Sequence, residues 1–282
     1  MIGFRFVNLL VPDDPAQFTV TGTHGVWSFN QENNFAAVKQ AVEEQGQCAE
    51  TYTAEHPITG NDGAIAVEGT WAELLPLCLG ASYLSGRSVT VKRSLPHSEL
   101  MFAQVGPKFP RERAISVAET CVNNQEEFRE VIEAFLAAYH GAGTSEKISL
   151  VVHHWLDTLA CWSLEDLYLS ATTTLQVIAA SEKRKAAIAH KLSFYEYLTA
   201  AAGRFHIPPL SHDTVKMRND LIHDGTLSGA SFVGKSAQQC NAVAADTLNW
   251  IDRYFHAALN LGPVRRVRFH QNVFNNLNAY SL

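Results

Sequence analysis

Asn123-Asn124-Gln125-Glu126-Glu127 marks the point at which the pattern of this 282-residue chain changes. An Asn followed three residues later by a Glu is a capping box, a pair of side chains that opens an α-helix. Beyond it, apolar residues recur at helical spacing, whereas the residues before it form short runs bounded by glycine and proline. The sequence therefore predicts an α+β fold, with a β-rich N-terminal domain over residues 1–122 and an all-α helical bundle over 123–282.

Short runs rich in β-branched and aromatic residues predict strands in the first domain. They are Phe18–Thr21, Gly25–Phe29, Ala64–Val67 and Ser88–Val91. A helix is predicted near Asn34–Gln45, where the apolar residues share one face. The stretch Leu74–Leu84 fits either a helix or a buried strand, because its apolar residues show no distinguishing period.

Capping residues and glycines separate the helical patterns of the second domain. The first helix is predicted to end at Gly141, and Ser145 and Ser163 to open the next two, unless these two form one long helix. Further helices are predicted over Ala186–Ala202, from Asp213 to Gly225 and from about Lys235 to Leu261. The pattern predicts a bundle of four to five helices.

Composition excludes several classes of protein. No apolar run is long enough to span a bilayer, and the N-terminus lacks the pattern of a secretory signal. Five scattered cysteines, none in a C-x-x-C pair, argue against a zinc ribbon or a disulfide framework. Phosphate-binding glycine motifs are absent, and His153-His154 and the pair His206 and His212 lack further ligands at metal-binding spacing. We expect a cytoplasmic protein that needs no metal and no cofactor and does not bind a membrane.

The net charge of −6 is unevenly distributed. Residues 1–140 hold 9 Lys and Arg against 17 Asp and Glu, whereas residues 141–282 hold 13 against 11. A protein that binds a nucleic-acid backbone concentrates basic charge on one surface. The candidates for such a surface are Lys183, Arg184, Lys185 and Lys191, although solvated helix ends give the same pattern. The charge therefore permits a nucleic-acid partner without requiring one.

Arg218-Asn219-Asp220-Leu221-Ile222-His223 is the candidate functional motif, and Gly225 ends its helix. Arginine offers a planar fork of donors suited to phosphate oxygens, and histidine can give and take a proton near neutral pH. A spacing of five residues turns the two side chains about 140° apart on a helix. The pair suggests phosphodiester chemistry without a metal, but a surface arginine and a histidine at a helix end would look the same.

This motif, near the end of the penultimate helix of an all-α bundle, resembles the signature of the HEPN superfamily. Trp155-Leu156-Asp157 and Leu164-Glu165-Asp166-Leu167 are similar to stretches in HEPN proteins of the ApeA-type anti-phage group. The resemblance covers residues 145–262 and nothing specific before residue 140. HEPN toxins with nucleotidyltransferase antitoxins usually carry tyrosine two residues after the histidine, where this chain has Gly225. Regulation by modification of that tyrosine is therefore not expected.

The resemblance implies a metal-independent endoribonuclease that cuts RNA by attack of the 2′-hydroxyl, in anti-phage defence or as a toxin. It gives His223 proton transfer, Arg218 stabilisation of the transition state, and Asn219 orientation of the histidine or of the phosphate. It also implies a homodimer through the helical domain, with both motifs in one cleft. Glu165 and Asp166 are candidates for a supporting carboxylate, although a surface or capping role also fits them.

Two other functions remain open from the sequence. The chain could be a non-catalytic HEPN module that binds a nucleotide or a protein partner, which its acidity favours. It could also be a regulator whose β-rich domain senses a ligand or a protein, such as a phage trigger, and restrains the helical domain.

Overall fold

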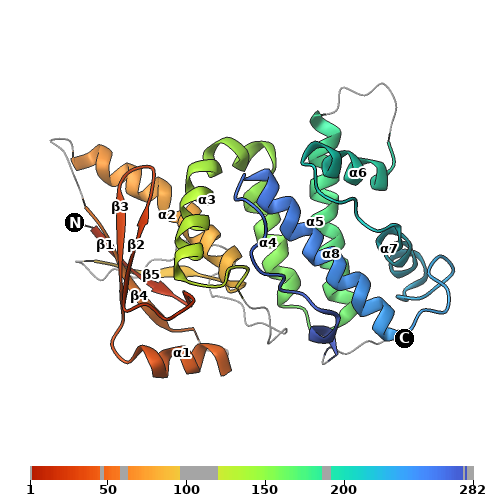
Figure 1. Cartoon of the computed structure of the whole chain (residues 1–282), viewed down its shortest axis with the longest axis horizontal. Coiled ribbons are helices and arrows are strands. Elements are labelled where there is room, and N and C mark those ends of the chain that lie inside the picture. The colour runs from red at the N-terminus through yellow and green to blue at the C-terminus, as the bar shows by residue number, and fades with distance from the viewer. Residues whose placement is uncertain are drawn as a thin grey trace. The chain divides into compact units, whose positions relative to one another are not determined.

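The computed structural model describes residues 2–44, 48–57, 63–95, 120–185, 192–275 and 277 (Figure 1). Contacts divide them into two compact units, the first reaching to His140 and the second starting at Gly141. This division differs from the boundary expected at residue 122. Helix α3 (Gln125–Ser145) places most of its length in the first unit, because Phe128, Val131 and Phe135 are buried there.

The first unit is built on a five-stranded sheet in the order β2-β3-β4-β1-β5, with every neighbouring pair antiparallel. Its strands are β1 (Ile2–Val7), β2 (Gln17–Thr21), β3 (Val26–Gln31), β4 (Glu50–His56) and β5 (Thr90–Leu95). Aromatic side chains fill its core, and Phe18 stacks on Phe29 at 4.5 Å between ring centroids. The order leaves β2 as an edge strand of the sheet.

The described part of this unit also contains helices α1 (Phe35–Glu44) and α2 (Gly63–Ser85). The strand predicted at Ala64–Val67 is wrong, because these residues belong to α2, and Leu74–Leu84 is the helix rather than the buried strand. From Pro76 to Ser85 every residue of α2 is buried. A helix buried on all sides carries no amphipathic period, so its apolar run could not be distinguished from that of a strand.

The second unit is a bundle of helices that follows the end of α3. Its elements are α4 (Ile148–Leu159), α5 (Leu164–Lys185), α6 (Phe194–Arg204), α7 (His212–Asp224), α8 (Ala237–Ala258) and the short 3-10 helix η1 (Gln271–Phe274). Trp155, Tyr168, Trp250 and Tyr254 are fully buried in its core. The α+β class is therefore confirmed.

Helix boundaries agree with the capping signals in part. Asp166 donates its backbone N–H to Ser163 Oγ at 3.0 Å, so α4 and α5 are two helices rather than one. Gly141 does not end α3, which continues to Ser145. Of the helix predicted over Ala186–Ala202, residues 186–191 lie outside the described ranges, and α6 begins after a capping box at Ser193.

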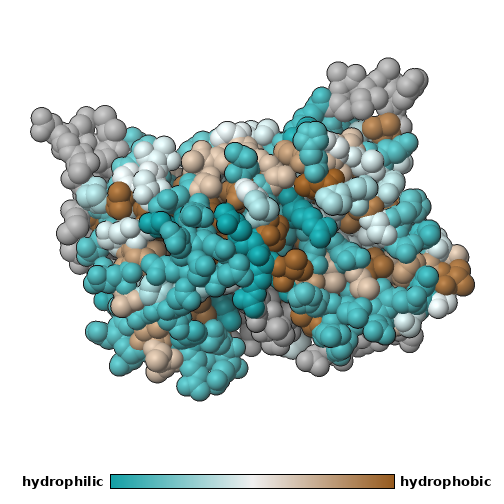
Figure 2. Space-filling view, viewed as in Figure 1, coloured by the Kyte–Doolittle hydropathy of each residue, from teal (hydrophilic) through white to brown (hydrophobic). Residues whose placement is uncertain are grey.

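Figure 2 shows hydrophilic side chains over most of the visible face, with apolar side chains in separate patches. Of the described large apolar side chains, Trp162 and Val233 are the most exposed, at 75% and 69%. Among the described helices none has the length and apolar character needed to cross a membrane.

Candidate functional site

Helix α7 carries the motif and is fixed in the bundle through its inner face. Ser211 caps its N-terminus by accepting the N–H of Asp213 at 3.2 Å, so the predicted cap at Asp213 is shifted by two residues. The buried Tyr168 of α5 donates its hydroxyl to the carbonyl of Thr214 at 2.6 Å. Thr214 also meets Thr247 of α8 at 3.3 Å between hydroxyl oxygens. Figure 1 shows α7 in this second unit, after α6.

Arg218 is half-buried in the middle of α7. Its guanidinium lies over the ring of Phe194, 4.8 Å from the centroid, at the start of α6. Burial lowers the pKa of the Arg218 guanidinium, while the nearby Tyr168 hydroxyl acts in the opposite direction. Its Nε is buried and donates no hydrogen bond within the described part of the chain. A buried donor without an acceptor costs about 1–3 kcal/mol, which an incoming anion would recover.

Two other inward-facing arginines of the same unit, unlike Arg218, are paired with carboxylates. Arg268 forms a buried two-point ion pair with Asp252, at 2.7 and 3.1 Å. Arg204 donates to two carboxylates, Glu182 of α5 and Glu146 directly after α3. Arg218 has no ion pair within the described residues, although it too faces the bundle. Arg218 is therefore a cation whose position is fixed by Phe194 and Asn219 and whose Nε donor is available to a ligand.

Asn219 supports the arginine rather than the histidine. Its side-chain oxygen accepts a hydrogen bond from Arg218 Nη1 at 3.1 Å. In the described part of the chain no hydrogen bond joins Asn219 to His223. The contact of Asn219 is therefore with Arg218, and no contact among the described residues supports the predicted orientation of the histidine.

His223 is exposed in the last turn of α7. Because both residues lie on one regular helix, their side chains point about 140° apart. Within the described residues no hydrogen bond or ring contact links His223 to Arg218. One copy of the chain thus presents a half-buried cation and an exposed proton carrier, without bringing the two together.

Asp220 is a residue of the motif that sequence reasoning did not assign. Its side chain is 1% exposed and accepts backbone N–H groups from Gly229, Ser231 and Phe232, at 2.7 to 2.8 Å. Burial raises the pKa of this carboxyl, but the three donors outweigh burial and hold the pKa below its usual value. An Asp followed by a loop of small residues, Ser228-Gly229-Ala230-Ser231, is the signal that could have indicated this role.

The loop after α7 is consequently well fixed. Gly225 adopts φ 69° and ends the helix in the left-handed conformation that glycine favours. Leu227 and Phe232 insert into the core, and Ser228 Oγ accepts the N–H of Lys235 at 2.9 Å. Asp220 thus fixes residues 229–232 of the loop that follows α7.

The two carboxylates proposed as supporting groups lie in the first turn of α5. Asp166 is exposed, and its N–H completes the cap of this helix. Glu165 is half-buried and lies near Cys240 of α8. Burial raises the pKa of the Cys240 thiol to about 11, and the negative charge of Glu165 adds to this increase. Among the described interactions none joins either carboxylate to Arg218 or His223.

The basic candidates are not gathered at the motif. Lys183–Lys185 end α5, whereas Tyr168, which lies near Arg218, belongs to its second turn. At 1.5 Å per residue the two ends are about 25 Å apart along the helix. Lys191 lies outside the described residues.

Lys185 takes part in a partly buried ionic cluster that joins several helices. Its amino group pairs with Glu146 and Glu182, each 5% exposed, and Arg204 pairs with the same two carboxylates. Tyr254 of α8 donates to Glu146 at 2.7 Å. Lys185 therefore has a structural role in addition to any contact with a ligand.

Comparisons with protein-family models, with curated proteins and with solved structures find no match for this chain. Within the described residues, no group of three or more His, Cys, Asp or Glu side chains is placed to hold a metal ion.

Proposed function

We propose that the chain is a metal-independent endoribonuclease of the HEPN type, with Arg218 and His223 as its catalytic residues. The observation that carries the proposal is Arg218, a half-buried guanidinium with an unused buried donor and no ion pair among the described residues. An anion such as a phosphodiester would supply the missing acceptor. His223, exposed on the same helix, is free to reach a substrate in solution.

The proposed reaction is an internal transfer within RNA. The 2′-hydroxyl loses its proton and attacks the adjacent phosphorus, while the bond from phosphorus to the 5′-oxygen breaks and that oxygen takes up a proton. The products are a 2′,3′-cyclic phosphate and a 5′-hydroxyl. His223 transfers protons, and Arg218, held by Phe194 and Asn219, stabilises the charge that develops on the phosphoryl oxygens.

The proposal includes a homodimer, because the 140° between the two side chains separates them within one copy. A second copy related by a two-fold axis would bring its own motif to the same cleft, so that Arg218 of one protomer could act with His223 of the other. The reaction needs both a base and an acid, and two copies also supply two histidines.

Cleavage of a single-stranded RNA in the presence of EDTA tests the activity. We expect Arg218→Ala to lower the rate about 10²–10³-fold and His223→Ala about 10²–10⁴-fold, with 2′,3′-cyclic ends in the wild-type products. Lys216→Ala is the matched control, since it removes a cation from the same helix that only pairs with Asp213. Unchanged cleavage by a chain carrying both substitutions would refute the assignment.

Mixing the two inactive variants tests the composite site. In a mixed dimer of Arg218→Ala and His223→Ala chains, the shared cleft would keep one intact arginine and one intact histidine, contributed by different protomers. We expect part of the activity to return on mixing, measured as RNA cleavage after the subunits exchange. Cleavage by each single variant at the wild-type rate would argue against the site itself, whereas no return on mixing would argue against the shared cleft only.

The second candidate is a non-catalytic module that binds a nucleotide or a protein. The position of Lys183–Lys185, about 25 Å along α5 from the motif, favours it, because an RNA-cutting site is expected to have basic groups around it. Binding of a nucleotide that Arg218→Ala abolishes, without any cleavage of RNA, would support this candidate instead.

A further inference from the structure

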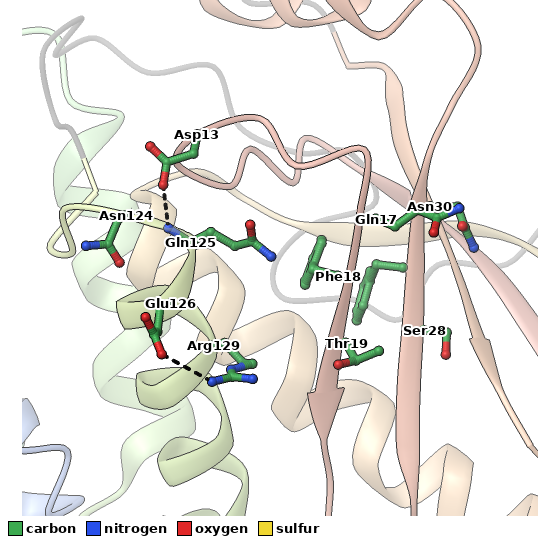
Figure 3. Close-up of a pocket in the computed structure, with 11 residues that line it drawn as sticks. Asp13, Gln17, Phe18, Thr19, Ser28, Asn30, Asn124, Gln125, Glu126 and Arg129 are labelled. Carbon is green, nitrogen blue, oxygen red and sulfur yellow. Dashed lines mark hydrogen bonds and ion pairs between the residues drawn. The ribbon is translucent and has the colours of Figure 1, made fainter.

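A groove runs along the free edge of β2 in the first unit. It encloses about 710 Å³ between the β2–β3 hairpin and the first turns of α3, within the size range of binding sites in proteins. Figure 3 shows Gln17, Thr19, Ser28 and Asn30 on the strand side, and Gln125, Glu126 and Arg129 on the helix side. All of these residues belong to one compact unit.

The register of the hairpin shows which backbone groups face the groove. Gly22 donates its N–H to Gly25, and Gln31 donates to Ala16, so the even-numbered residues of β2 bond to β3. In an antiparallel pair, the residues that alternate with the hydrogen-bonded ones turn their N–H and C=O groups away from the partner strand. Gln17, Thr19 and Thr21 therefore present their backbone groups at the edge of the sheet.

Thr21 shows that the outward backbone groups of β2 can form hydrogen bonds. Thr21 donates its N–H to Glu133 of α3 at 2.7 Å, which closes the edge at the end of the strand. At Gln17 and Thr19 no partner for the outward backbone groups occurs within the described residues, and both residues are exposed. The open part of the edge is the part that lines the groove.

We propose that this groove binds an extended, basic peptide segment of a partner protein, which adds a strand to the edge of β2. An extended peptide is the ligand whose N–H and C=O groups match the alternate, outward groups of Gln17 and Thr19. A new strand lies about 4.8 Å from its neighbour, so the groove between β2 and α3 must remain open to hold it.

The charges around the groove select the side chains of the peptide. Asp13 and Glu126 are exposed carboxylates that line the groove, and the half-buried Glu133 accepts the N–H of Thr21, against one lining guanidinium, that of Arg129. Arg129 is moreover paired with Glu126 at 3.7 Å. This acidic border favours Lys or Arg over Asp or Glu in the segment. The inference holds whether or not the helical unit cleaves RNA.

The experiment is a binding assay with the full chain against an array of random linear hexapeptides. A soluble pair of acetylated and amidated peptides accompanies it, one alternating valine and lysine and the other alternating valine and glutamate. We expect array hits enriched in Lys and Arg, and at least tenfold tighter binding of the lysine peptide. The amide protons of Gln17 and Thr19 should become protected from exchange when it binds.

Variants separate this groove from other surfaces. Thr19→Pro removes one outward N–H at an edge position that tolerates proline, and should weaken binding at least tenfold, whereas Thr19→Val keeps the N–H and should not. Glu126→Arg should reverse the preference for the lysine peptide, while the exposed control Glu44→Arg on α1 should leave it unchanged.

Binding that survives Thr19→Pro would overturn the proposal, as would an array without hits tighter than about 1 mM. Dimerisation lost in Thr19→Pro, without any peptide binding, would assign the edge to a second copy of the chain instead.

Discussion

At the scale of single residues, the motif of α7 combines two opposite solutions to burying a charge. Asp220 is buried and accepts hydrogen bonds from three backbone N–H groups. Arg218 is half-buried, and its Nε has no hydrogen-bond acceptor among the described residues. A group that is satisfied inside the fold stabilises it. A group that is left unsatisfied is available to a ligand. The same six residues therefore hold a structural anchor and a candidate binding cation.

Asp220→Ala tests the anchor. The substitution leaves three N–H groups without their acceptor, and we expect the free energy of unfolding to fall by about 3 kcal/mol. Because the pKa of Asp220 is held below its unfolded value of about 3.9, its contribution is present above that pH and is lost as the pH falls through the folded pKa. Urea unfolding at pH 7 and pH 3 should show a difference between wild type and Asp220→Ala that shrinks at the lower pH.

Arg218→Lys tests whether a charge alone suffices at this position. Lysine keeps the positive charge but lacks the planar fork that lies over Phe194 and bonds to Asn219. We expect cleavage of RNA to fall about 10²-fold. The unfolding midpoint should change little, because the lost hydrogen bond to Asn219 is only part-buried and Nε has no acceptor among the described residues. Wild-type cleavage by the lysine variant would show that only the charge matters.

His256 on α8 gives the second unit a pH dependence of its own. Its ring is 1% exposed, and burial lowers the pKa of His256 to about 4. The carboxylate of Asp252 and the backbone carbonyl of Gly262 act to raise this pKa, whereas the positive charges of Arg268 and Arg265 lower it further. The unfolded histidine takes up a proton near pH 6.5, so the unfolded state binds more protons below that pH. Stability is therefore complete above pH 6.5 and decreases as the pH falls toward 4.

The expected loss between pH 6.5 and pH 4 is about 3 kcal/mol, because each pH unit between the unfolded and folded pKa of His256 contributes about 1.36 kcal/mol. His256→Gln should remove this pH dependence while retaining a polar side chain near Gly262. Calorimetry between pH 7 and pH 4 measures the effect, and a wild-type chain equally stable at both values would contradict it.

At the scale of elements, helix ends are held together by the ionic cluster around Glu146. Hydrogen bonds from Lys185, Tyr254 and Arg204 outweigh burial, which by itself raises the pKa of this carboxyl, and keep the pKa below its usual value. The cluster links the end of α3 with α5, α6 and α8. Glu146 is the carboxylate that all three side chains contact, whereas Glu182 pairs only with Lys185 and Arg204.

Glu146→Ala should destabilise the second unit by about 2–3 kcal/mol. Removal of one member of a buried pair costs about 3–5 kcal/mol, and the 34% exposure of the Arg204 side chain reduces that figure through solvent screening. Lys216→Ala, which breaks only the exposed pair with Asp213, is the control and should change stability by less than about 0.5 kcal/mol. Equal effects of the two substitutions in chemical unfolding would contradict the role of the cluster.

At the scale of the whole molecule, α3 is a continuous helix that serves both compact units. Its residues up to His140 pack with the sheet, and Phe128 meets Phe18 edge to face at 6.3 Å. Two units with separate cores are expected to unfold in separate steps. The charge is divided in the same way, with −8 in residues 1–140 and +2 in residues 141–282.

Phe128→Ala should therefore affect one unit only. We expect the unfolding step of the first unit to lose about 3–5 kcal/mol, because a large buried ring is removed, while the step of the second unit stays unchanged. Hydrogen exchange read separately for β1 and α8 distinguishes the two steps. Loss of protection in both elements together would show that the units unfold as one.

Local signals in the sequence were sufficient for the α+β class, for β2, β3 and α1, and for the caps at Ser163 and Gly225. These features depend on neighbouring residues, whose periods and hydrogen bonds are fixed by the backbone alone. The Arg218–His223 motif was also readable, since it lies on one helix.

Tertiary structure alone decided the remaining features. Strands β1 and β4 were not predicted, because residues on both of their faces are buried and clear alternation is missing. The identity of α2 and the boundary at residue 140 depend on what packs around α2 and α3. The three donors around Asp220, the missing partner of Arg218 and the open edge of β2 arise from residues that are distant in the sequence. Such long-range contacts leave no local period, so the sequence identified the motif and the fold determined what each of its residues can do.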